Sequence, residues 1–589
     1  MDNQFNNVNA PNEAPPSRNI KPVYSSDTAY QSQQNLPPQT PYATAPPFAQ
    51  PAQNAQPAQG NGYYSAYVPK PKLRVPITAR DAVFAIIFCV LSIVSVDLGL
   101  FGGFNMGYSI STVLVTVFIC FYACGGNRFT LFGGYCAICA VAIAATFTVY
   151  NSLESKFIQV IAVWILLTIS LIDFTKSGQY SQNGWRGALD VLRIMFVTPF
   201  ERMETFFGSV CASENNISLR RKRYTAALIG LACAVPALII ILPLLVASDA
   251  AFEQLLKNTI FSDLPRLFGS IVLGCVFFVL VFTSIFAATK KIVVRHDDNK
   301  TTKVKGLNPI AVNSFFGVVS FVYAVYILSQ MTYFFSAFSG LLPENFTVAE
   351  YARRGFFEMT VICAINLILV GITFILTRKN ERGEVPRATK GLCVFIIAFS
   401  LAIIFTVCAK LALYMNNFGL AKMRVYTTIF SAMLAVVFIC ALIRLCVRRF
   451  PYFKVCAAII AAIGVAVSVA DVNTVIAYYN HEAYRAGVVN DLDVEYFGYL
   501  GDAGVPYLVD LLNEPEFKQE AAEALVNSAY NYGDYEEDYT DDYEWFIVSD
   551  IQLYEENSDF RLYNTSHIKA ANLIKENWKQ IAEISNASW

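Results

Sequence analysis

The sequence contains few charged residues for its length. Only 15% of its 589 residues are Asp, Glu, Lys or Arg, whereas 55% are hydrophobic. A soluble protein carries roughly 25% charged residues, because its surface must face water. Lipid must therefore surround much of this chain. The formal net charge of −1 also excludes nucleic acid as a bulk electrostatic partner, because phosphate binding needs clustered positive charge.

Residues that bind metals or carry out catalysis are also scarce. The chain has only three histidines, which lie far apart, and nearly all of its 14 cysteines fall in apolar stretches, as is usual for buried thiols. It lacks a phosphate-binding G-x-x-x-x-G-K-[ST] loop, an H-E-x-x-H zinc motif and a G-x-S-x-G nucleophile elbow. We therefore expect no cofactor and no metal site. The missing motifs favour a non-enzymatic protein, with an enzyme as an alternative.

The first 80 residues differ in composition from the rest. Residues 1–80 are rich in Pro, Gln, Asn and Ala and contain almost no aliphatic run. Such a segment cannot bury enough apolar surface to offset the entropy lost on ordering. We predict a disordered cytoplasmic tail, to which a cytoplasmic protein partner would bind. Because the first apolar run starts only near Ala82, we expect no secretory signal peptide.

Long apolar segments recur from residue 81 onward. Each has about 17 to 25 residues, enough to cross the hydrocarbon core of a bilayer as a helix. The predicted spans are 82–104, 107–124, 130–150, 157–174, 225–247, 267–288, 308–336, 357–377, 391–413, 425–443 and 455–477. The fold class is therefore an all-α polytopic bundle of about eleven transmembrane helices over residues 81–477.

Lys and Arg are distributed unevenly among the loops between these spans. Every second loop is rich in them, including 220–223 and 290–305, while the loops in between hold only scattered cations. Loops rich in positive charge stay in the cytoplasm. We predict a multi-pass protein of the cell membrane with a cytoplasmic N-terminus. The odd number of spans makes the C-terminus extracytoplasmic.

Two helical regions are predicted outside the spans. Near 184–208, Leu189, Leu192, Phe196 and Phe200 recur at three- and four-residue spacing, which is typical of an amphipathic helix on the cytoplasmic surface. Its role is to carry the chain along the interface, or alternatively to couple the bundle to a cytoplasmic partner. Residues 478–589 have ordinary polarity and a helical pattern, which predicts a small helical extracytoplasmic domain.

Ionisable residues in or beside the spans are the candidate functional residues. A charge in hydrocarbon is costly unless it is paired or hydrated. Under the predicted topology all of these residues fall toward the outer leaflet: Asp97, Arg353, Arg354, Glu358, Lys410, Arg424 and Asp471. They predict an outward-facing polar site for an anionic lipid or an envelope component. The alternatives are ion pairs that dock the C-terminal domain, and interfacial charges that simply reach toward water.

Four segments together resemble a family of bacterial membrane proteins. They are SAFSGLLPENFTVAEYARRGFFEM (336–359), LALYMNNFGLAKMRVYT (411–427), VNTVIAYYNHEAY (472–484) and DFRLYNTSHIKAANLI (559–574). The set resembles the domain of unknown function 4173, which is related to 4153. The resemblance implies a multi-pass protein of a bacterial cell membrane, and it supplies no activity.

Three functions fit these observations. The first is a non-enzymatic sensor or envelope-associated scaffold. The second is a transporter or lipid flippase, although no matching pair of broken helices, which many transporters have, is visible in the sequence. The third is a membrane enzyme that acts on a lipid-linked substrate at the outer face, with Arg353, Arg354, Glu358 and Asp471 as its active site.

Overall fold

The computed structural model describes residue 75 and residues 77–585, except 126–128, 180–183, 213–263, 294–305, 339–355, 379, 381–384, 448, 490–491 and 530–559. These residues all belong to one compact unit, Pro71–Trp589. Most of the predicted tail, residues 1–80, lies outside the described residues. The first helix, α1, begins at Ala79, where Thr78 caps it and Asp81 bonds back to Thr78.

The described part of the chain contains ten helices that are long and apolar enough to cross a membrane. They are α1 (Ala79–Gly99), α2 (Met106–Cys124), α3 (Leu131–Ala145), α4 (Leu153–Thr175), α9 (Leu264–Thr289), α10 (Pro309–Phe338), α12 (Phe356–Leu376), α13 (Arg387–Phe418), α14 (Lys422–Cys446) and α15 (Tyr452–Ala470). Each overlaps one predicted span, so the prediction of an all-α, multi-pass membrane protein is confirmed. The remaining span, 225–247, falls outside the described residues.

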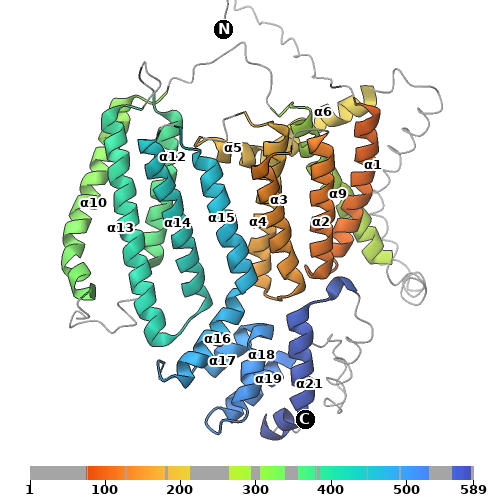
Figure 1. Cartoon of the computed structure of the whole chain (residues 1–589), viewed down its shortest axis with the longest axis vertical. Coiled ribbons are helices and arrows are strands. Elements are labelled where there is room, and N and C mark those ends of the chain that lie inside the picture. Colours follow the sequence, from red (N-terminus) through yellow and green to blue (C-terminus); the bar gives the residue numbers. More distant parts are fainter. Residues whose placement is uncertain are drawn as a thin grey trace, which may run out of the picture. The chain divides into compact units, whose positions relative to one another are not determined.

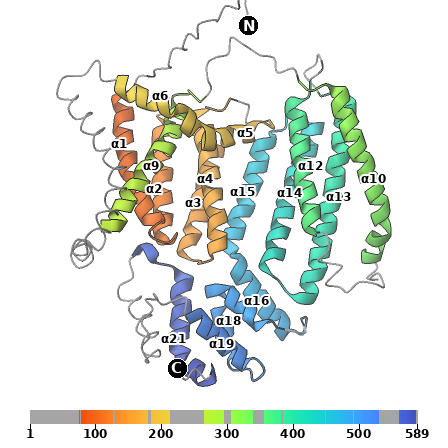
Figure 2. The ribbon, with the colours of Figure 1, turned by 180° about the vertical axis from the view of Figure 1, so that it is seen from behind.

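The spans form two groups with separate hydrophobic cores (Figures 1 and 2). In the first group, α1, α2, α3, α4 and α9 pack around aromatic rings such as Phe88, whose centroid lies 4.7 Å from that of Phe118 and 5.8 Å from that of Phe282. In the second group, α10, α12, α13 and α14 pack together. Helix α15 lies between the groups and contacts both α3 and α14.

Interhelical hydrogen bonds hold the second group together at mid-span. Asn366 of α12 is fully buried, and its amide donates to Ser400 Oγ of α13 at 3.0 Å. Its side-chain oxygen accepts from Tyr323 of α10 at 2.7 Å. A polar group in a membrane interior must find partners on neighbouring helices. Asn366 therefore joins three spans.

A helical segment lies across one end of the first group (Figure 1). It comprises α5 (Gly187–Leu192), the π-helical turn η2 (Arg193–Val197) and α6 (Thr198–Ala212), and it lies where the amphipathic helix near 184–208 is predicted. Just before α5, the ring of Trp185 stacks 4.8 Å from Phe374 of α12 and 4.2 Å from Tyr452 of α15. These contacts join the two groups at the end of the spans where α4 finishes.

The C-terminal helices have a core of their own. They are α16 (Val472–Arg485), α17 (Val494–Tyr499), η4 (Gly501–Ala503), α18 (Val505–Leu511), α19 (Lys518–Ala529), η6 (Phe560–Leu562) and α21 (Thr565–Ser585). Buried apolar side chains such as Leu508, Leu525 and Ile574 fill the space between them. These helices lie at the opposite end of the spans from α5 and α6 (Figure 1).

The last predicted span, 455–477, runs past the true end of the membrane helix. Helix α15 stops at Ala470 because Asp471 adopts φ +47°, a conformation that interrupts a right-handed helix. The Asp471 carboxylate then accepts from the Thr474 backbone N–H at 3.0 Å and caps α16. The chain therefore turns at Asp471 into the C-terminal domain.

Asp173 provides a test of how α15 is held. Its buried carboxylate accepts from Lys454 Nζ at 2.7 Å, from the Gly133 backbone N–H at 3.1 Å and from Thr130 Oγ1, so it joins α4 to α15 and α3. We expect Asp173→Ala to cost about 3 kcal/mol, as breaking a buried ion pair does. Thermal unfolding in detergent measures this loss. Glu201→Gln, which breaks an exposed pair with Arg193, is the control, and equal midpoints for the two variants would contradict the prediction.

Candidate functional site at the junction with the C-terminal domain

Asn564 fastens the C-terminal domain to the membrane helices. It is 1% exposed, and its Nδ2 donates to the backbone oxygens of Phe147 and Tyr150, both at 2.9 Å, in the loop between α3 and α4. Its Oδ1 accepts from the His567 backbone N–H at 3.2 Å, which caps α21. One side chain therefore starts a helix of the C-terminal domain and binds the end of the bundle.

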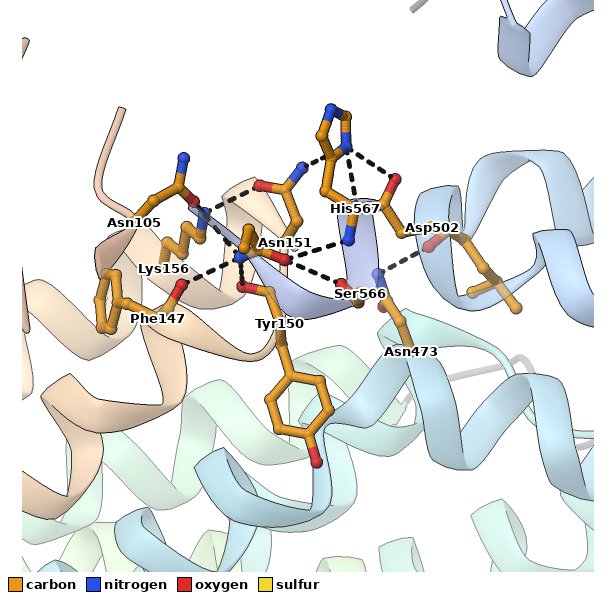
Figure 3. Close-up of polar contacts among 11 residues, drawn as sticks. Asn105, Phe147, Tyr150, Asn151, Lys156, Asn473, Asp502, Ser566 and His567 are labelled. Carbon is orange, nitrogen blue, oxygen red and sulfur yellow. Dashed lines mark hydrogen bonds and ion pairs between the residues drawn. The ribbon is translucent and has the colours of Figure 1, made fainter. Parts of the chain in front are cut away.

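Lys156 is the buried cation of the junction. It lies in the first turn of α4, is 4% exposed, and donates from Nζ to Asn105 Oδ1 at 2.6 Å and to Asn151 Oδ1 at 2.8 Å (Figure 3). Asn564 Nδ2 lies 3.3 Å from the same Asn105 oxygen. Within the described part of the chain, Lys156 forms no ion pair, so the amide oxygens replace the water that burial removes.

His567 extends this network to η4, the turn between α17 and α18. Its Nδ1 lies 3.2 Å from Asp502 Oδ2 and 3.4 Å from Asn151 Nδ2 (Figure 3). A protonated Nδ1 donates to Asp502, and an unprotonated Nδ1 accepts from Asn151. The backbone takes part as well, because the Ser566 N–H donates to the Val149 oxygen at 2.9 Å.

Lys422 forms a second attachment point. It is the first residue of α14, and its Nζ pairs with Glu154 of α4 at 3.1 Å and donates to the Tyr499 backbone oxygen of α17 at 2.8 Å. Its backbone N–H donates to the Tyr496 hydroxyl at 2.8 Å. Lys422 therefore joins the first group, the second group and the C-terminal domain.

Of the candidate residues predicted from the sequence, Asp97 also contacts the C-terminal segment. Its carboxylate lies near the end of α1 and binds Arg266 Nε of α9 at 3.0 Å and Arg561 Nη1 at 2.6 Å. Ser270 Oγ donates to the same carboxylate at 3.2 Å. The ion pair with Arg561 links α1 to η6 across 464 positions in the sequence.

The other candidate residues lie elsewhere. Arg424 Nη1 donates to the backbone oxygen of Gly419 at 2.7 Å and closes the turn after α13, while Asp471 caps α16. Glu358 is exposed in the first turn of α12, and Lys410 is partly buried in α13. Arg353 and Arg354 fall outside the described residues. In the described part of the chain Asp97, Arg424 and Asp471 have different partners, and none of the three forms a hydrogen bond or an ion pair with another.

The comparisons with known proteins place the chain in a family. A family model described as a domain of unknown function, DUF4153, matches residues 137–511, which is well over half of the chain. The chain belongs to the DUF4153 family. No curated protein and no solved structure matches the chain. The resemblance to the related family 4173 is not confirmed.

The DUF4153 match covers only some of the residues of the junction. It includes Asn151, Lys156 and Asp502, and it ends before Asn564 and His567. It also contains three of the four segments on which the resemblance rests, while the segment 559–574 lies beyond it. Among the residues that the structure describes, no group of three or more His, Cys, Asp or Glu could hold a metal ion. At the junction the polar groups form hydrogen bonds with one another, and this arrangement suits the attachment of the C-terminal domain to the membrane helices.

Asn564→Ala should loosen the junction without unfolding the C-terminal core. The change removes the hydrogen-bond donor to the backbone oxygens of Phe147 and Tyr150, and it removes the cap of α21. Each buried polar group that loses its hydrogen bond lowers the stability by about 1 to 3 kcal/mol. We expect faster hydrogen–deuterium exchange in residues 560–568 and 147–151, with no change in α19.

Asn577→Ala is the matched control for this variant. It lies in the same helix, α21, and among the described residues its amide donates only to the Leu573 backbone oxygen of its own helix, at 2.8 Å. Its exchange should equal that of the unaltered protein. Equal exchange in both variants would show that Asn564 does not fasten the domain.

Proposed function

We propose that this DUF4153 member is a non-enzymatic membrane scaffold that holds its C-terminal helical domain in a fixed orientation on the membrane. The observation that carries the proposal is the hydrogen-bond network in which the buried side chains of Lys156 and Asn564 share Asn105, with the exposed Asn151 as the second acceptor of Lys156. The polar groups at this end of the bundle bind the C-terminal domain, and a binding site for a soluble substrate would instead leave such groups open to water.

Three separate attachments support a fixed orientation. Helix α16 follows directly from α15, Asn564 binds the loop between α3 and α4, and Lys422 binds α17. A domain that is attached at several separate points cannot rotate freely about any one of them. A ligand or a partner that shifted the domain would therefore also shift α4 and α14. The same geometry suits a sensor. A scaffold that bound its partner only under some conditions would transmit that binding to α4 and α14.

We place the C-terminal domain on the extracytoplasmic side and the N-terminus in the cytoplasm. The alternation of cation-rich and cation-poor loops supports this orientation. The domain would then face the cell envelope, and the N-terminal tail would meet cytoplasmic proteins. The proposed partner is accordingly an envelope component that recognises the exposed surface of the C-terminal helices.

In-cell photocrosslinking tests the scaffold. A photoreactive amino acid at Gln519 or Glu520, both exposed in α19, should capture one discrete envelope component in the native membrane. Combining it with Asn564→Ala should lower the yield at least fivefold, because the domain loses its fixed orientation, and Asn577→Ala should leave the yield unchanged. The proposal fails if no discrete adduct forms or if Asn564→Ala has no effect on the yield.

A lipid flippase is the second candidate, favoured by the division of the spans into two groups with separate cores. Such groups can move relative to each other, as alternating access requires. Proteoliposomes with a fluorescent phospholipid, bleached from outside by dithionite, separate the candidates. The scaffold predicts that half of the label stays protected, as in protein-free liposomes. Full bleaching in intact vesicles would favour the flippase.

A further inference from the structure

Val191 and Ile194 pack into the core of the first group, but the segment from α5 to α6 carries five other large apolar side chains outward. Their exposed fractions range from 40% to 67%. These residues are Leu189, Leu192, Phe196, Val197 and Phe200. In a water-soluble protein the apolar face of a surface helix points to the core. Here it points away from the protein.

Polar residues on the opposite face bind the bundle. Asp190 is buried, and its carboxylate accepts from the Gln179 backbone N–H at 3.1 Å. Arg202 is also buried, and its guanidinium donates to the Val293 backbone oxygen at 3.4 Å. A rotation of the segment about its axis that buried its apolar face would break these two hydrogen bonds. The bonds therefore hold the apolar face outward.

The apolar residues keep a helical spacing through the π-helical turn η2. Leu189, Leu192, Phe196 and Phe200 recur at intervals of three and four residues, and all four are exposed. The apolar face is therefore continuous from α5 into α6.

The depth of the segment follows from its contact with α9. Ser284 Oγ donates to the Ile194 backbone oxygen at 3.1 Å, and Ser284 lies five residues before the end of α9 at Thr289. At 1.5 Å per residue, the segment lies about 8 Å inside the end of this span. Interfacial helices lie at such depths, with the apolar face at the boundary of headgroups and acyl chains.

We propose that the face formed by Leu189, Leu192, Phe196, Val197 and Phe200 binds the bilayer leaflet at the end of the spans opposite the C-terminal domain. The occupant is phospholipid, since the first turns of α1 at this same end expose Val83, Ile86 and Ile87 and so continue the apolar surface. Because Trp185 stacks on Phe374 and Tyr452, the lipid-bound segment connects directly to the second group of spans.

Photocrosslinking to lipid tests this assignment in the full chain. Benzoyl-phenylalanine replaces Phe196 or Phe200 in protein reconstituted into vesicles of phosphatidylethanolamine and phosphatidylglycerol. These side chains are exposed, so the substitution leaves the packing intact. Mass spectrometry should find lipid adducts in yields within about twofold of those from Phe321, a 70% exposed residue of α10.

Two comparisons make the outcome decisive. Glu520, exposed in α19 of the C-terminal domain, is the negative control, and its lipid adducts should be at least fivefold fewer. An adduct from residue 196 or 200 to another segment of this chain, or to a second copy, would overturn the proposal. Lipid adducts at the level of the Glu520 control would overturn it as well.

Discussion

The ammonium group of Lys156 must find oxygen acceptors inside the protein, because burial removes it from water. The side-chain oxygens of Asn105 and Asn151 provide them, and Asn564 bonds to Asn105 in turn. Asn564 lies more than 400 positions from Lys156 in the sequence. The position of the C-terminal domain therefore depends on the need of Lys156, in the first turn of a membrane helix, for oxygen acceptors. Removing Asn105 or Asn151 takes away one of the two acceptors of the buried ammonium group.

The two ends of the bundle differ in which side chains face outward and in what covers them. At the end near Lys156, polar side chains turn inward and bind a protein domain. At the other end, Asp190 and Arg202 turn inward while Phe196 and Phe200 turn outward. Polar groups are satisfied by protein at both ends, and the difference lies in what covers the remaining surface. A domain covers one end and lipid, on our proposal, covers the sides of the other.

The sequence predicted the spans well because one strong signal determines them. A run of about 20 apolar residues has few alternatives to a membrane helix. It predicted the end of α15 poorly, since the residues on both sides of Asp471 suit a helix, and only the φ of +47° at that residue breaks it. The junction was missed because asparagines carry no charge. The sequence of Asn564 followed by Thr565 and Ser566 does match a helix start, and that signal was available.

The pairing of distant residues could not be predicted from one sequence. Asp97 was selected as a candidate because a charge in a span needs a partner, but Arg561 could not be chosen over the other cations of the chain. The DUF4153 match sharpens this point, because it contains Lys156 and Asn151 but not Asn105 or Asn564. The matched region therefore supplies the buried cation and only one of its two acceptors. The rest of the chain must complete the site, so the segments outside the match belong to the same structural unit as the segment inside it.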